Sequence, residues 1–194
     1  MNAPVDPSGL AEACIAGGSG FQQEARYETQ CEFETLAGVF GLQIAITVKA
    51  SVEPDGVLTQ GLESAVTHSA EMSVPLLATL ALLAPDARTT LATVGLSISD
   101  ASPTEAQNEL EGTPAEITGE FLLNTADTPA TANGSGPVRL DLVAFAISMN
   151  GLVTADGMEL VPGGEATVTE ESEECGPLTL ASDAEAISFE VVAP

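Results

Sequence analysis

Basic residues are scarce in this sequence of 194 residues, which has four Lys and Arg residues against 29 Asp and Glu residues and a formal net charge of −25. A protein that binds nucleic acid needs a basic face, because its cations must replace the counterions around the phosphates. Nucleic-acid binding is therefore excluded. Attraction to an anionic membrane surface is excluded for the same reason. We expect the carboxylates to form a solvated surface that keeps the protein soluble.

Trp is absent, and the sequence has one Tyr and one His. The histidine, His68, is followed by Ser69, but adjacent side chains on a strand point to opposite faces, and no Gly-x-Ser-x-Gly turn is present. We therefore expect His68 to be an exposed strand residue without a catalytic role. Paired carboxylates alone do not indicate a glycosidase, because such clefts are usually lined by aromatic side chains. The sequence predicts no catalytic residues and no enzyme activity.

Motifs for metal ions and phosphates are missing as well. The three cysteines are isolated, and His68 and Met72 are two ligands without others, so neither a zinc site nor a soft-metal site is predicted. The glycine-rich stretch 17–20 follows no strand and is typical of a linker. An acidic cluster in residues 170–174 lacks EF-hand spacing, which leaves bound calcium only as a weak alternative. We expect no cofactor and no metal site.

Long hydrophobic runs are also lacking. A membrane-spanning helix needs about 20 consecutive apolar residues, whereas the nearest stretch, residues 74–84, is shorter and contains Pro75. Residues 1–9 have neither the basic start nor the apolar core of a signal peptide. We expect no membrane insertion, and either an internal location or a leader that precedes Met1.

The sequence does have a clear period of two, which is typical of strands with one buried face. Residues 26–35 alternate between a polar face and an inward face, and residues 42–49 repeat the pattern. Further strands are expected within 57–72, at 93–99 and 117–123, at 138–149, and near 158–161, 166–169 and 187–191. The expected inward residues of the first strand are Tyr27, Thr29, Cys31, Phe33 and Thr35.

Two features interrupt this pattern. Leucines between Pro75 and Pro85 recur at helical spacing, with proline suited to the first turn and to the stop, so one short helix is expected across the end of the fold. The inward register shifts between Leu142 and Phe145, which predicts a β-bulge. Residues 100–113 and 125–137 are expected to be long loops, the second with an Asn133-Gly-Ser135 sequon.

This pattern predicts an all-β fold, an antiparallel β-sandwich of about eight to ten strands with one short helix. Residues 1–22 contain two prolines and the glycine-rich run, so we expect a flexible N-terminal arm there. Residues 23–194 are expected to form a single sandwich domain.

The cysteines lie at informative places. Cys31 begins the strand-rich region and Cys175 lies near its end. A bond between them would contribute about 4 to 5 kcal/mol in the chain-entropy model, and it would indicate an oxidising compartment. We favour this pair, but spacing does not determine connectivity, so Cys14 is free, joined to another chain, or a competitor of Cys175 for Cys31.

The chain contains several short motifs, namely Tyr27-x3-Cys31-x-Phe33, a glycine followed by an alternating Ile/Val strand, the late Cys175, and the terminal Ile187-Ser-Phe-Glu-Val191. Together they resemble the motifs of a secreted actinobacterial domain family of unknown function. The resemblance covers about residues 26–192. It implies export, a β-sandwich and the Cys31–Cys175 disulfide, and it implies no known activity. The extreme acidity and Cys14 depart from the family pattern.

Taken together, these features predict a non-enzymatic structural or binding module that is secreted or displayed at the cell surface. The alternative is a self-assembling subunit of a virion, filament or shell, whose arm of residues 1–22 reaches into a neighbour. A protein partner or self-association is therefore expected in either case. A carbohydrate-binding module is a third alternative, disfavoured by the few aromatic residues.

Overall fold

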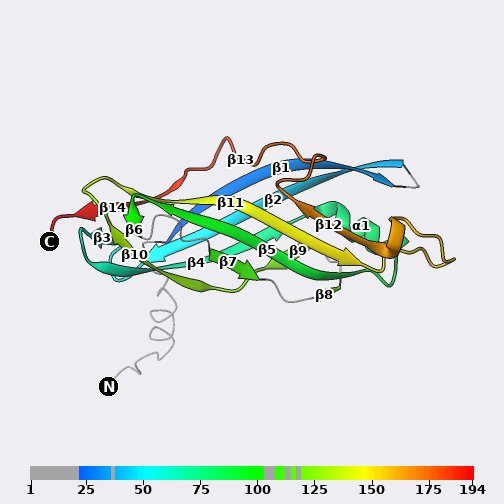
Figure 1. Cartoon of the computed structure of the whole chain (residues 1–194), viewed down its shortest axis with the longest axis horizontal. Coiled ribbons are helices and arrows are strands. Elements are labelled where there is room, and N and C mark those ends of the chain that lie inside the picture. The colour runs from blue at the N-terminus through cyan, green and yellow to red at the C-terminus, as the bar shows by residue number, and fades with distance from the viewer. Residues whose placement is uncertain (1–21, 36–37, 103–107, 112–114, 117–118) are drawn as a thin grey trace, which may run out of the picture.

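Two sheets face each other in the computed structural model, which describes residues 22–35, 38–102, 108–111, 115–116 and 119–194. The sheets are mostly antiparallel and elongated, and α1 (Pro75–Leu83), the one α-helix among the described residues, is short and lies toward one end (Figure 1). The expected all-β sandwich with one short helix is confirmed. The predicted arm lies outside the described residues, except for Gln22.

The first sheet has the order β13-β1-β2-β4-β10-β6, and β9 pairs with β4 beside β10. Its two longest strands, β1 and β2, pair in continuous antiparallel register, and β1 lies next to the short edge strand β13. The bounds are β1 Gln23–Thr35, β2 Gly38–Val52, β4 Glu63–Ser73, β6 Ala101–Ser102, β9 Glu120–Leu122, β10 Ala126–Ala132 and β13 Thr179–Leu180.

The second sheet has the order β3-β14-β11-β5-β7, with β12 paired to β11 and β8 paired to β5. Among the described strands its one parallel pair is β3 with β14, which joins residues 190–192 to residues 57–59. The bounds are β3 Val57–Thr59, β5 Arg88–Ser99, β7 Asn108–Glu111, β8 Ala115–Glu116, β11 Val138–Asn150, β12 Glu165–Thr169 and β14 Ile187–Val192. A short 3-10 helix, Pro162–Gly164, precedes β12.

Alternation along the strands produces the core. Tyr27, Thr29 and Cys31 of β1 are buried as predicted, and so are the alternate residues of β2 from Leu42 to Val52. Because the period is two, the opposite faces of both strands carry the polar side chains into solvent. Phe145 and Phe189 are among the largest fully buried side chains, and most of the other core residues are aliphatic.

Helix α1, Pro75–Leu83, begins at Pro75 as expected. Only Leu77 of this helix is fully buried, whereas Leu82 is 83% exposed. The helix therefore covers the sandwich with one narrow face, and it packs against β2. No helix among the described residues is long and apolar enough to cross a membrane.

Two predicted loops were wrong. The interval 125–137 contains β10, which pairs with β4, and 100–113 contains β6 and β7. The signal was hidden in β10 because its buried residues are small, namely Thr128, Ala130 and Ala132, and because it contains Pro129. Proline is tolerated where a strand edge lacks a partner, and β6 reaches only the last residues of β10. The prediction of a single strand within 57–72 was also wrong, because two strands, β3 and β4, lie there.

The predicted bulge in β11 is confirmed. Its register against β5 shifts between Leu142 and Ala144. Gly95 lies opposite, where a Cβ atom would come within 2.9 Å of the Ala144 Cβ atom. The Phe145 backbone N–H at this irregularity donates to the Glu170 carboxylate at 2.8 Å. Gly95 and the Glu170 carboxylate therefore accommodate the extra residue of β11 at the bulge.

Candidate functional site

A C-terminal segment, residues 174–181, covers the open edge of β1, and we call it the strap. Three backbone hydrogen bonds of 2.8 Å join them, from the N–H groups of Glu32, Gly176 and Ala181. The acceptors are the carbonyls of Glu174, Gln30 and Arg26, respectively. The strap thereby protects an edge that could otherwise pair with another chain.

The Cys31–Cys175 disulfide fastens this strap to β1. Cys31 is fully buried on the inner face of β1, and Cys175 is partly buried. The bond spans 144 residues of sequence, so it links the first strand of the fold to its last quarter. The predicted pairing is thus present in the structure. Cys14 lies outside the described residues.

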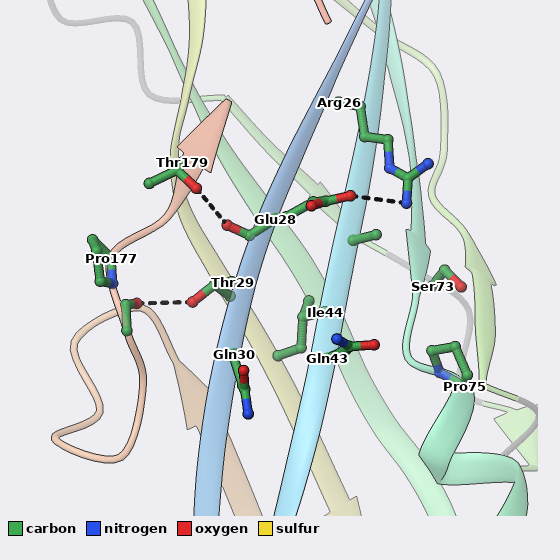
Figure 2. Close-up of a pocket in the computed structure, with 12 residues that line it drawn as sticks. Arg26, Glu28, Thr29, Gln30, Gln43, Ile44, Ser73, Pro75, Pro177 and Thr179 are labelled. Atoms are coloured by element: carbon green, nitrogen blue, oxygen red, sulfur yellow. Dashed lines mark hydrogen bonds and ion pairs between the residues drawn. The ribbon is translucent and has the colours of Figure 1, made fainter. Parts of the chain in front are cut away.

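Beside the strap, a trough of about 470 Å³ crosses the outer face of β1 and β2. Figure 2 shows the strap with Pro177 and Thr179 on one side and Pro75, at the start of α1, on the other. The floor carries cross-strand neighbours, Gln30 opposite Gln43 and Glu28 opposite Ala45. The small side chain of Ala45 leaves room between longer neighbours.

Hydrogen bonds hold the strap wall in place. Thr29 donates through its hydroxyl to the Gly176 carbonyl at 2.8 Å, and the Thr179 hydroxyl donates to the Glu28 carbonyl at 3.3 Å (Figure 2). Arg26 and Glu28 form an ion pair of 2.9 Å whose side chains are about half exposed. An exposed pair of this kind adds little stability, so these charges stay available to a ligand.

The trough offers amide, hydroxyl, guanidinium and carboxylate groups to solvent. These groups can accept and donate hydrogen bonds in several directions, which suits recognition of a polar ligand. No histidine or cysteine lines it, so no nucleophile with an adjacent base is assembled there. The arrangement of these groups suits non-covalent binding.

His68 is buried rather than exposed, which corrects the sequence prediction. Its side chain is only 1% exposed and lies on the inner face of β4, with Nε2 2.9 Å from the Thr128 hydroxyl. Burial lowers the pKa of His68, whereas Asp127 raises it. Ser69 points to the opposite face, as expected. Because β10 was expected to be a loop, its partner Thr128 could not be foreseen.

Other buried polar atoms do not form a site either. The Tyr27 hydroxyl, the His68 Nδ1 atom and the Thr89 hydroxyl are buried without hydrogen-bond partners among the described residues. The pKa of Tyr27 is raised above its ordinary value, mainly because the hydroxyl is buried. The Leu142 backbone lowers this pKa, and the negative charge of Asp141 raises it. Tyr27, His68 and Thr89 lie on β1, β4 and β5, and none of them lines the trough.

The acidic cluster is spread out instead of converging on one point. Glu170 accepts the Phe145 N–H, whereas Glu173 and Glu174 line a separate hollow next to Cys175. Within the described ranges, no group of three or more His, Cys, Asp or Glu side chains could hold a metal ion.

The trough was not foreseen from the sequence. Gln30 and Gln43 are uncharged residues on otherwise charged or small outward faces, and this contrast was the available signal. Their pairing depends on the β1–β2 register, and the wall depends on the strap, so neither could be placed from the sequence.

Comparison of the chain with family models, curated proteins and solved structures finds no match to any of them.

Proposed function

We propose that this chain is an exported, non-enzymatic structural or binding module of the cell surface or extracellular space, and that the trough is its binding surface. The observation that carries the proposal is the disulfide-fastened strap, which both closes the β1 edge and forms one wall of the trough. Stable structural disulfides belong to oxidising compartments. The acidic, largely polar surface suits a soluble module.

Export is tested by fractionating cells that express the native gene under thiol-blocking conditions. We expect the chain outside the cytoplasm, with Cys31 and Cys175 inaccessible to a maleimide until a reductant is added. A cytoplasmic protein whose Cys31 and Cys175 both react without reduction would contradict export.

Binding is tested with washed cell envelopes of the source organism as the probe. The double variant Gln30→Ala/Gln43→Ala should lose retention on the envelopes, because it removes both amides from the trough floor. Ser51→Ala, on β2 but outside the trough, is the matched control. Equal retention of the parent protein, the double variant and Ser51→Ala would exclude the trough as the binding surface.

Light scattering on the purified protein, in the absence of envelopes, tests the alternative role of a self-assembling subunit. A monomer supports the binding module. Closed particles or filaments that form without a partner would favour assembly.

A further inference from the structure

We propose that Asn133 is a site of spontaneous deamidation that the fold leaves open, whereas the same dipeptide at Asn150-Gly151 is blocked. Both asparagines precede glycine, the residue that hinders attack by its own backbone nitrogen least because it has no Cβ atom. The chain therefore contains one candidate and one internal control.

Asn133 lies in the exposed connection between β10 and β11. No atom lies within 4 Å of a Cβ built on Gly134, so its surroundings are open. The Gly134 N–H donates no hydrogen bond to the described part of the chain. The nucleophilic nitrogen is therefore uncommitted.

Ser102 makes the side-chain amide carbon of Asn133 easier to attack. Its hydroxyl donates to the Asn133 Oδ1 atom at 2.6 Å. A donor in this position stabilises the negative charge that develops on the oxygen when the carbon is attacked. The Asn133 N–H is held by the Asp100 carbonyl at 3.1 Å, which keeps the residue beside Ser102. Ser102 is thus a positioning residue for the reaction.

The reaction balances without an oxidant or a partner. Solvent base removes the Gly134 N–H proton, and the nitrogen forms a bond to Cγ of Asn133. The bond from Cγ to the side-chain nitrogen breaks, and ammonia leaves with a proton from water. Water then opens the resulting cyclic imide at either carbonyl, which gives aspartate or isoaspartate.

Asn150 is protected by the sheet. It is the last residue of β11 and pairs with Arg88 of β5 and Glu165 of β12. Gly151 has a φ of 72°, and a Cβ atom there would lie 2.5 Å from the Asp86 carbonyl oxygen. Pairing on both sides keeps Asn150 extended, so the Gly151 nitrogen cannot reach its Cγ atom.

The consequence is local. Isoaspartate adds a methylene to the main chain, and either product adds a carboxylate to an already acidic protein. Among the described residues, β6 pairs with the end of β10 alone, at Thr131 and Ala132. We therefore expect the reaction to loosen this sheet edge and leave the disulfide-fastened edge unchanged.

The test is a time course of the purified full chain at mildly alkaline pH, followed by peptide mapping that separates aspartate from isoaspartate. We expect conversion at Asn133, faster as the pH rises, and an unchanged amide at Asn150. In urea both sites should convert at similar rates, because only the fold distinguishes them.

Variants assign the roles of the neighbours. Gly134→Ala should fit without strain, because its Cβ atom would have no neighbour within 4 Å and the backbone at Gly134 is not left-handed. We expect this variant to slow the reaction by an order of magnitude or more, because the Cβ atom hinders attack by the backbone nitrogen. Ser102→Ala should slow it severalfold, the effect of one lost hydrogen bond, and Ser102→Thr should restore the rate. Equal conversion of Asn133 and Asn150 in the folded protein, or a stable Asn133, would overturn the proposal. A glycan on Asn133 in protein from the native source would overturn it in favour of the sequon.

Discussion

At the scale of single residues, His68 is a titratable side chain buried in the core. The imidazole lies in the core with Nε2 next to the Thr128 hydroxyl, and Nδ1 has no hydrogen-bond partner among the described residues. Burial of the charged form would be costly, and this is why the pKa lies below the ordinary value. The sequence placed His68 on a strand, but it did not reveal which face of that strand was covered.

We expect His68 to make stability depend on pH. Because its pKa is lower in the folded protein, the unfolded chain binds the proton first as the pH falls. Its contribution is therefore complete above about pH 6.5, the ordinary histidine value, and is lost as the pH falls below it, by at most about 1.4 kcal/mol per pH unit. Urea unfolding between pH 8 and pH 5 measures this.

His68→Gln provides the comparison, because the many carboxylates also titrate at low pH. The slope of unfolding free energy against pH should be smaller in the variant than in the parent protein. Identical slopes would mean that His68 is not the group responsible.

At the scale of elements, the bulge in β11 depends on the residue opposite it. Gly95→Ala should cost about 1–3 kcal/mol, because the new methyl group meets the Ala144 methyl group at 2.9 Å. The double variant Gly95→Ala/Ala144→Gly should recover part of this loss. Chemical denaturation of the three proteins measures both effects.

Gly41→Ala is the matched control on the other sheet, because a Cβ atom there meets its nearest neighbour at 3.7 Å, an ordinary contact. A Gly95→Ala protein as stable as Gly41→Ala would show that β11 relaxes freely at the bulge.

The strap is the other element whose role can be measured. Replacing both Cys31 and Cys175 by serine should lower stability by about 5 kcal/mol in the chain-entropy model for so long a ring. Amide hydrogen exchange should increase along the strap first, since its hydrogen bonds lie at an edge. Calorimetry and exchange mass spectrometry test these two effects separately.

Uniform exchange throughout the double-serine variant would indicate global loosening and contradict the local role of the disulfide. Unchanged thermal stability would show that the strap hydrogen bonds alone hold the β1 edge.

For the molecule as a whole, charge is the dominant property. With a net charge of −25, repulsion between carboxylates opposes the compact state. We expect added sodium chloride to stabilise the protein by about 1 kcal/mol or more, equivalent to roughly 2–4 °C in Tm. Sucrose at equal osmolality separates screening from general solute effects. A Tm that is independent of salt would contradict this.

Much of the architecture could be predicted from the sequence, and the exceptions have physical causes. The long strands β1, β2 and β11 were predictable because large apolar residues alternate with polar or small ones. The β10 strand was missed because alanine and threonine give little contrast between faces. The parallel pairing of β3 with β14 joins segments more than a hundred residues apart, which no local pattern records.

The sequence alone determined the strand periodicity, the bulge, the helix between two prolines, and the acidity, because each depends on neighbouring residues or on composition. The tertiary structure decided the burial of His68, the strap over β1, the trough, and the difference between Asn133 and Asn150. These features depend on which segments lie side by side, and that is set by packing of the whole chain.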